Sequence, residues 1–216
     1  MLIVDHLETD IGNTNILRDV SVVVPEGAVC GIIGRNGAGK TTLLRSIMGV
    51  LPARHGLIEI DGKDVTAVPA HERVQMGIGY MPEDRRLVTN FTVEENISLP
   101  AWANGRQDIS SRLDWVYGIM PEVGERRRAK VNQLSGGQQK MVTLARAMMG
   151  AIKLLLLDEP FEGLAPALAR RLAEVMSSLK DEGMSVLIAD SNEQHVVDLL
   201  DNLYRIERGE IVGARN

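Results

Sequence analysis

The feature that most constrains this chain is a glycine-rich loop between an apolar run and a helical pattern. Residues 34–41 read GRNGAGKT and fit the phosphate-binding pattern G-x-x-x-x-G-K-[ST] at every fixed position. The apolar run at 29–33 predicts a buried strand, and the spacing at 42–48 predicts a helix that ends at Gly49. A strand, loop and helix in this order direct backbone N–H groups and the positive end of the helix dipole at one point. The context favours a phosphate site over a chance glycine turn that carries Lys-Thr.

The side chains of the loop indicate how a nucleotide would be held. Lys40 is expected to reach the β- and γ-phosphates as a point charge, and the hydroxyl of Thr41 is expected to bind Mg²⁺. Gly37 and Gly39 let the backbone approach the phosphates without a Cβ in the way. The predicted nucleotide-binding residues of the loop are Gly34, Arg35, Asn36, Gly37, Ala38, Gly39, Lys40, Thr41 and Thr42.

The composition is that of a soluble α/β chain. Of the 216 residues, 44% are hydrophobic and 3% are aromatic, which suits an aliphatic parallel sheet buried under helices. No run approaches the roughly 18 apolar residues of a membrane span, and a net charge of −5 gives no reason to expect a nucleic-acid partner. The N-terminus lacks a signal-peptide pattern, and the single cysteine, Cys30, is expected to be a small buried hydrophobe. We therefore expect a reduced, cytoplasmic protein.

The rest of the chain predicts a sheet interrupted by a helical insertion. Hairpins are expected around Asp61-Gly62 and Arg208-Gly209, and further strands at 2–4, 20–24, 77–81, 153–157 and 184–189. Helices are expected at 70–76, 111–120, 166–183 and from about Asn192, and capping boxes begin at Thr92 and Ser135. We therefore predict one domain over 1–216, in which a helical subdomain at about 92–149 interrupts a catalytic core formed by 1–91 and 150–216.

Two adjacent carboxylates end the predicted strand at 153–157. Because side chains alternate in direction along a strand, Asp158 and Glu159 are expected to point in different directions and to hold different roles. Asp158 is placed to bind Mg²⁺, and Glu159 to orient and polarise the attacking water, since phosphoryl transfer depends mainly on positioning and charge compensation. A leucine-rich strand that ends in Asp-Glu is a weak signal alone, but beside the phosphate loop it is a strong one.

A second anion-binding helix start follows the predicted insertion. Residues 134–138 read LSGGQ, a glycine pair behind a capping serine. With this motif between the phosphate loop and the Asp-Glu strand, the chain resembles the nucleotide-binding subunits of ABC transporters over essentially its whole length. Within that family it is most similar to the branched-chain (hydrophobic) amino-acid import ATPases. This finer resemblance depends on residues 36–42, 92–96, 126–128, 158–160 and 163–166.

The resemblance implies a fold, ligands and partners. It implies an α/β P-loop NTPase, an ABC ATPase with a parallel core sheet, an antiparallel β edge and an inserted helical subdomain, which uses ATP and Mg²⁺. It also implies a head-to-tail dimer with a second copy or a paralogous ATPase subunit, in which Ser135 and Gly137 of one chain close over the γ-phosphate held by the other. Integral membrane permease subunits would place the chain on the inner face of the cell membrane, with an extracytoplasmic solute-binding protein as an indirect partner.

Three positions depart from the family pattern. Glu83 stands where a glutamine is usual; its carboxylate can still ligate Mg²⁺ but adds negative charge, which Arg85 and Arg86 are expected to offset. Ile11 replaces the aromatic residue that stacks on adenine, and Ser191 replaces the histidine that contacts the γ-phosphate. The resemblance implies the catalytic residues Lys40, Glu83, Glu159 and Ser191, the metal ligands Thr41, Glu83 and Asp158, and the further nucleotide contacts Ile11, Ser135, Gly136, Gly137 and Gln138.

Several of these residues have a second interpretation. Ser191 and Gln194 form a capping box, so the serine is alternatively a helix cap, with His195 about one turn further along the same helix. Leu87, Val88 and Phe91 are candidates to receive a helix of the permease or to pack into the chain's own core. The basic run at 126–128 has two interpretations: a contact with acidic lipid or with a partner, or a solvated helix face.

The sequence predicts the energy-coupling subunit of an importer for branched-chain or other amino acids. One alternative is a soluble ABC-type clamp or scaffold driven by ATP, although the chain lacks the tandem domain, coiled coil or basic surface usual in such proteins. Another is a nucleotide-gated dimer that hydrolyses little ATP, which Ser191 and Ile11 favour and Glu159 argues against. No cysteine or histidine lies at zinc-ligand spacing, so no zinc site is expected.

Overall fold

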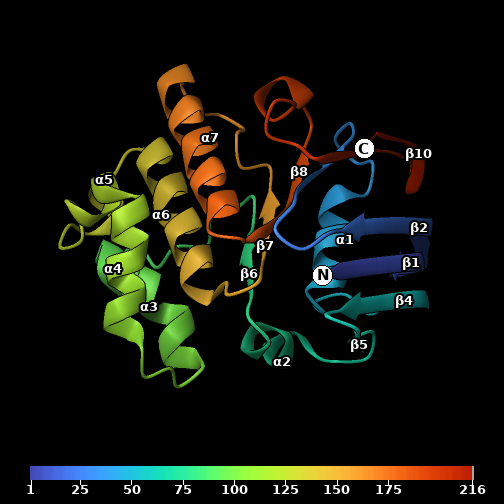
Figure 1. Cartoon of the computed structure of the whole chain (residues 1–216), viewed down its shortest axis with the longest axis horizontal. Helices are drawn as coiled ribbons and strands as arrows, with labels where there is room; N and C mark the ends of the chain where they lie inside the picture. Colours follow the sequence, from blue (N-terminus) through green and yellow to red (C-terminus); the bar gives the residue numbers. More distant parts are fainter. Residues whose placement is uncertain (216) are drawn as a thin grey trace.

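A computed structural model describes residues 1–215 of the chain, and Asn216, the last residue of the predicted domain, lies outside the described residues. The described part consists of two sheets and a set of helices (Figure 1). The helices that follow β6 in the chain lie on the left of Figure 1, and the strands nearest the N-terminus lie on the right. Helix α1 (Lys40–Ile47), which follows the phosphate loop, is labelled between β7 and the strands on the right.

The central sheet has six strands in the order β10-β9-β3-β8-β7-β6. All neighbouring pairs are parallel except β9 and β10, which form the predicted antiparallel hairpin. Strands β3, β7 and β8 are buried along their whole length, as expected for parallel strands covered on both faces. The six strands are β3 (Val29–Ile33), β6 (Ile78–Met81), β7 (Leu154–Asp158), β8 (Ser185–Asp190), β9 (Asn202–Glu207) and β10 (Glu210–Arg215).

The second sheet is antiparallel, with four strands in the order β2-β1-β4-β5. Its first two strands are much longer than the runs predicted at 2–4 and 20–24, because irregularities in the pairing break the alternation of buried side chains after Val4. Gly12, with a φ of 60°, closes the turn between them. The four strands are β1 (Leu2–Ile11), β2 (Thr14–Val24), β4 (His55–Ile60) and β5 (Lys63–Asp64).

The helices begin where the sequence supplies caps. Thr92 and Glu95 form the predicted capping box of α3, and Ser135 and Gln138 form that of α6. Helix α7 begins at Pro166, as predicted. The helices are α1 (Lys40–Ile47), α2 (Ala70–Gln75), α3 (Val93–Ala103), α4 (Ile109–Ile119), α5 (Pro121–Gly124), α6 (Gly136–Gly150) and α7 (Pro166–Asp181), and short 3₁₀ helices span Val131–Gln133 and Glu193–His195.

The core is divided by the central sheet. One buried cluster joins the sheet to α3, α6 and α7, and the other joins its opposite face to α1 and the antiparallel sheet. Cys30 is fully buried in the second cluster, as predicted. Within residues 1–215, no helix has both the length and the hydropathy needed to cross a bilayer.

Candidate functional site

The phosphate loop connects β3 to α1 in a conformation that requires glycine. Gly37 and Gly39 have φ angles of 82° and 112°, in the left-handed region that side chains rarely adopt. Gly34 is required for a different reason, because a Cβ there would lie 2.3 Å from the carbonyl oxygen of Ile206. The loop therefore exposes backbone N–H groups at the start of α1, and the helix begins directly at Lys40.

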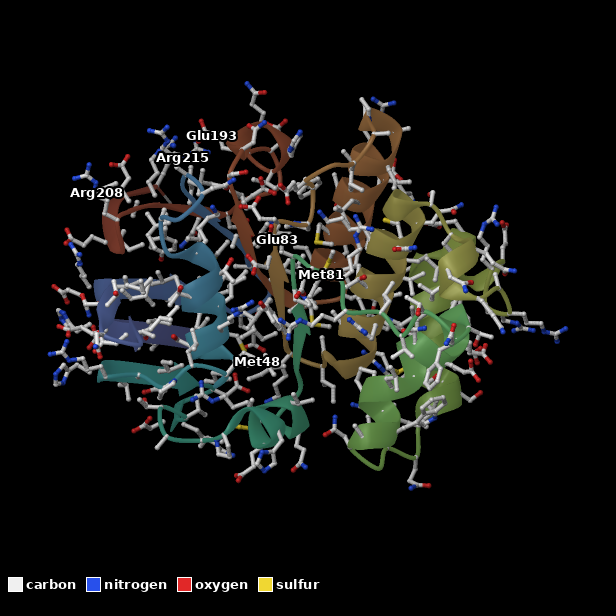
Figure 2. The ribbon with its side chains drawn as sticks, turned by 180° about the vertical axis from the view of Figure 1, so that it is seen from behind. Met48, Met81, Glu83, Glu193, Arg208 and Arg215 are labelled. Atoms are coloured by element: carbon white, nitrogen blue, oxygen red, sulfur yellow. The ribbon has the colours of Figure 1, made fainter. Side chains whose placement is uncertain are left out.

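One cavity of about 390 Å³ is lined by half of the predicted site residues. It opens beside the loop and includes Ile11 from the end of β1, so the predicted base-contact position does lie at the phosphate loop. Glu83 also lines it, and Figure 2 labels this residue close to Met81, the last residue of β6. The lining residues are Ile11, Ile16, Asn36, Gly37, Gly39, Lys40, Thr41, Thr42, Glu83, Glu159 and Glu162.

The ammonium of Lys40 is buried and fully engaged by the chain itself. Its Nζ donates to the carbonyl oxygens of Gly34 at 2.7 Å and Arg35 at 3.2 Å. It also pairs with Oε1 of Glu159 at 3.0 Å, and both side chains are nearly inaccessible, with 5% and 7% of their surfaces exposed. A phosphate group at this loop would therefore compete with internal partners for the lysine.

Asp158 lies beside Thr41 at the end of β7, although it does not itself line this cavity. Its Oδ1 accepts a hydrogen bond from the hydroxyl of Thr41 at 3.1 Å, and its Oδ2 accepts one from the hydroxyl of Tyr80 at 3.3 Å. Burial and the negative charge of Glu83 raise the pKa of Asp158 to about 6, against the hydrogen bond from Thr41. A nearby cation would favour the ionised carboxylate.

These oxygens fit the requirements of Mg²⁺ better than those of a metal held by protein alone. In residues 1–215 no three His, Cys, Asp or Glu side chains form a metal cluster. Mg²⁺ usually takes one or two protein oxygens and completes its shell with substrate phosphates and water. The paired oxygens of Thr41 and Asp158, beside the loop and within the field of Glu83, have this chemistry.

Glu159 follows the end of β7, and its carboxylate has partners different from those of Asp158. Its backbone has a φ of 46°, in the left-handed region, and its N–H donates to the carbonyl oxygen of Ala189 at 2.8 Å. Its Oε2 accepts hydrogen bonds from the backbone N–H of Ser191 at 3.0 Å and from the hydroxyl of Ser191 at 3.2 Å. Lys40 and Ser191 together fix the direction of this carboxylate.

The alternative interpretation of Ser191 as a helix cap is wrong. Asn192 is the cap: its Oδ1 accepts from the backbone N–H of Gln194 at 3.0 Å. The predicted helix from Asn192 is also wrong in type, because only one 3₁₀ turn, Glu193–His195, follows β8. The reason is tertiary: β8 delivers Ser191 to the end of β7, where its hydroxyl donates to Glu159 rather than capping its own segment. The ring of His195 stacks on Phe161 at 5.7 Å.

The arginines expected to offset the charge of Glu83 have other partners. Arg86 pairs with Asp84 at 2.8 Å, and Nη1 of Arg85 donates to Oε1 of Gln139 at 3.2 Å. Both arginines have left-handed backbones, with φ angles of 59° and 47°, which turns the loop toward α6. Within residues 1–215 neither arginine forms an ion pair with Glu83, and Glu83 is one cause of the raised pKa of Asp158.

The predicted signature residues lie apart from the phosphate loop of their own chain. The Oγ of Ser135 accepts from the backbone N–H of Gln138 at 3.3 Å, and Oε1 of Gln138 accepts from the N–H of Ser135 at 2.9 Å. Gly136 and Gly137 follow at the start of α6, and a Cβ on Gly137 would lie 2.6 Å from Leu168. None of these four residues lines the cavity that contains Lys40.

Sequence reasoning missed two residues that contact the site. Tyr80 donates to Asp158, and its position in the strand that pairs with β7 is a signal that would have suggested this contact. Lys140, only 5% exposed, donates through Nζ to the carbonyl oxygens of Glu159 and Glu162. A lysine beside Met141 and Leu144 on an apolar helix is the corresponding signal for that contact.

The ABC transporter family matches residues 17–162 of this chain. The chain is 36% identical to the high-affinity branched-chain amino acid transport ATP-binding protein BraG of Pseudomonas aeruginosa, covering 98% of this chain and 91% of BraG. It is 31% identical to the probable branched-chain amino acid transport ATP-binding protein LivF of Archaeoglobus fulgidus, covering 91% and 84%. It is 32% identical to the lipopolysaccharide export system ATP-binding protein LptB of Haemophilus influenzae, covering 99% and 90%.

Solved structures show the same fold. A nucleotide-free ATP-binding cassette from an ABC transporter superposes with a TM-score of 0.88 at 28% identity, covering 99% of this chain and 90% of that one. The ADP conformation of an ABC transporter cassette superposes with a TM-score of 0.86 at 28% identity and the same coverage. The α/β P-loop fold predicted from the phosphate loop is therefore confirmed.

Proposed function

This chain belongs to the ABC transporter family as an ATP-binding, ATP-hydrolysing subunit, and we propose that it powers an importer for branched-chain or other amino acids. The observation that carries the catalytic part is the meeting of Lys40, Thr41 and Glu159 at one cavity, with Asp158 hydrogen-bonded to Thr41 directly beside it. The names of BraG and LivF support amino acids as the solute. The similarity to LptB favours a second candidate, an ATPase for a different solute.

We assign roles in hydrolysis to the residues around the cavity. Lys40 exchanges its internal partners for the β- and γ-phosphates, and the N–H groups of the loop complete the phosphate site. Thr41 and Asp158, with Glu83 beside them, are the residues that would hold Mg²⁺, which supplies compensation of phosphate charge. Glu159, oriented by Ser191, accepts a hydrogen bond from the attacking water and polarises it.

The remaining half of the phosphate site is proposed to come from a second ATPase subunit. Ser135, Gly136, Gly137 and Gln138 form the start of a 15-residue helix and do not reach the phosphate loop of their own chain. A head-to-tail dimer with a second copy or a paralogue brings this helix N-terminus to the γ-phosphate, where its free N–H groups favour an anion. Residues 92–149, inserted between 1–91 and 150–216, are then a subdomain that carries this helix start.

A groove on the side of α6 is the proposed contact with an integral membrane permease. It has a volume of about 390 Å³ and is lined by residues of the 83–89 loop together with Val131 and Gln139. Of the three apolar candidates, Leu87 lines this groove and also packs against the core, whereas Val88, which is 39% exposed, does not line it. This contact would hold the chain on the inner face of the membrane, with an extracytoplasmic solute-binding protein as an indirect partner.

The test is recovery of the transporter from its native membrane. The chain, tagged and expressed in its own cells, is purified in mild detergent, and the copurifying membrane proteins are reconstituted with it in vesicles. We expect ATP-dependent uptake of radiolabelled leucine or valine, which Glu159→Gln abolishes. Recovery of a permease whose vesicles transport no amino acid would reject the proposed solute, and a chain that associates with no membrane protein would reject the transport role.

A further inference from the structure

The ammonium of Lys140 is buried against two backbone carbonyls beside the catalytic glutamate. Its Nζ lies 2.5 Å from the carbonyl oxygen of Glu159 and 2.7 Å from that of Glu162. Its hydrogen-bond partners in residues 1–215 include no carboxylate, although a charge buried in this way is unfavourable without strong compensation. Burial lowers the pKa of Lys140, and the carboxylates of Glu162, Asp190 and Glu159 oppose that shift. The free-energy cost of burying this charge indicates that the Lys140 side chain has a specific role.

The two carbonyls are the ends of one turn. Glu159 begins it with a φ of 46°, a conformation that a non-glycine residue adopts only when its surroundings hold it. The N–H of Glu162 donates back to the carbonyl oxygen of Glu159 at 3.3 Å, and Gly163, with a φ of 69°, leads the chain away. Lys140 bridges both ends of this turn and so holds it closed from the side of α6.

The conformation of this turn determines where the Glu159 carboxylate points. With the left-handed backbone, its Oε1 lies 3.0 Å from Lys40 and its Oε2 accepts from Ser191. Relaxation of Glu159 toward an ordinary backbone conformation would turn the Cα–Cβ bond and move the carboxylate off both partners. We propose that Lys140 is a positioning residue for Glu159, acting through the backbone of the 159–162 turn.

The same contact connects two functional parts of the chain. Lys140 stands on α6 five residues after Ser135, which is about 7.5 Å along a continuous helix. Figure 1 shows α6 between α7 and the pair formed by α3 and α4. If the proposed head-to-tail dimer is correct, Ser135 meets the nucleotide of one site while Glu159 serves the other. Lys140 then couples the two nucleotide sites of the dimer. A shift of the α6 N-terminus at one site would change the position of Glu159 at the other.

Three variants test the positioning role. Lys140→Met keeps the length of the side chain and removes its donors, and Lys140→Arg restores donors for both carbonyls. Lys153→Met removes an exposed lysine whose ion-pair partner among residues 1–215 is Asp61. We expect Lys140→Met to lower kcat by ~10–100-fold, as small misplacements of catalytic groups do, with the Kd for ATP within about threefold of wild type. Lys140→Arg should recover most of the rate, and Lys153→Met should leave it unchanged.

Hydrogen exchange and a second background separate positioning from stability. In Lys140→Met we expect faster exchange confined to the segment 158–164, whereas a general loss of stability would raise exchange across the sheet. In a Glu159→Gln background, Lys140→Met should cause no further loss of the residual single-turnover hydrolysis rate, because it acts only through that carboxylate. A Lys140→Met protein with normal kcat per ATP-binding molecule, or with an equal loss in both backgrounds, overturns the proposal. Lys140→Gln gives the same comparison if the methionine variant does not fold.

The link between the sites has its own readout. With Mg-ATP, Glu159→Gln is expected to form a dimer in gel filtration and to protect the segment 158–164 from exchange. Adding Lys140→Met should leave the dimer intact and remove that protection. A protected turn in the double variant overturns the link, and absence of the dimer in Glu159→Gln removes the proposed head-to-tail arrangement on which the link rests. The kcat comparison still judges the positioning role in either case.

Discussion

Replacing Ser191 with alanine removes one of the two hydrogen bonds that orient the carboxylate of Glu159. The hydroxyl donates to Oε2 at 3.2 Å, while the backbone N–H of the same residue donates at 3.0 Å and is retained in the variant. A hydrogen bond to a charged acceptor contributes about 1.5–3 kcal/mol, and the exposure of Ser191 and the retained N–H reduce this to about 1 kcal/mol. We therefore expect Ser191→Ala to lower kcat by about fivefold.

The control is the neighbouring residue that does cap the following turn. Asn192→Ala removes the acceptor for the N–H of Gln194 and is expected to lower the free energy of unfolding by about 0.5–1 kcal/mol without changing kcat. Both variants are measured by phosphate release at saturating Mg-ATP and by urea unfolding. Ser191→Ala should change the rate and leave the unfolding midpoint nearly constant.

The opposite pattern would refute this reasoning. A Ser191→Ala protein that hydrolyses ATP at the wild-type rate but unfolds at lower urea would make Ser191 the cap. Equal losses of rate in both variants would mean that the whole segment after β8, rather than the hydroxyl of Ser191, supports the carboxylate. Titration of ATP binding in each variant ensures that rates are compared at equal occupancy.

Three further outcomes are expected. Lys40→Ala should abolish ATP binding measured with a fluorescent nucleotide, because it removes the charged contact with the phosphates; affinity like that of wild type would contradict the site. Ile11→Tyr should tighten ATP relative to GTP by about 0.5–1.5 kcal/mol in calorimetric titration, and an unchanged preference would mean that another residue reads the base. Burial raises the pKa of Cys30 to about 12, so the reactive thiolate is scarce at pH 8. The folded protein should therefore resist iodoacetamide, and the urea-unfolded protein should react with it. Rapid labelling of the folded chain would show instead that the strand opens.

The parts of the structure that follow from local chemistry were predictable. The loop at 34–41, the caps at Thr92 and Ser135 and the buried strand before Asp158 each depend on residues close together in sequence. The left-handed glycines of the loop leave little choice of backbone once the Lys-Thr pair is present. These features fix the identity of the fold because a parallel sheet with a phosphate loop has few alternatives.

The parts of the structure that depend on contacts between residues distant in sequence were not predictable. The box at Ser191 and Gln194 has the sequence of a cap, but Glu159, 32 residues earlier in the chain, offers the hydroxyl a charged acceptor instead. The strands β1 and β2 were predicted too short because their pairing irregularities disrupt the alternation that marks a strand. Lys140 gave no motif at all, since its partners are carbonyls in a turn 19 to 22 residues away.

The contacts that Lys40 makes within the chain affect the free energy of nucleotide binding. Two loop carbonyls and the carboxylate of Glu159 already surround the ammonium of Lys40 and compensate its buried charge. ATP binding is then an exchange reaction, and its free energy is the difference between two well-formed sets of contacts rather than the full strength of either. Because the ammonium can regain these internal partners when nucleotide leaves, we expect the same contacts to make product release easier.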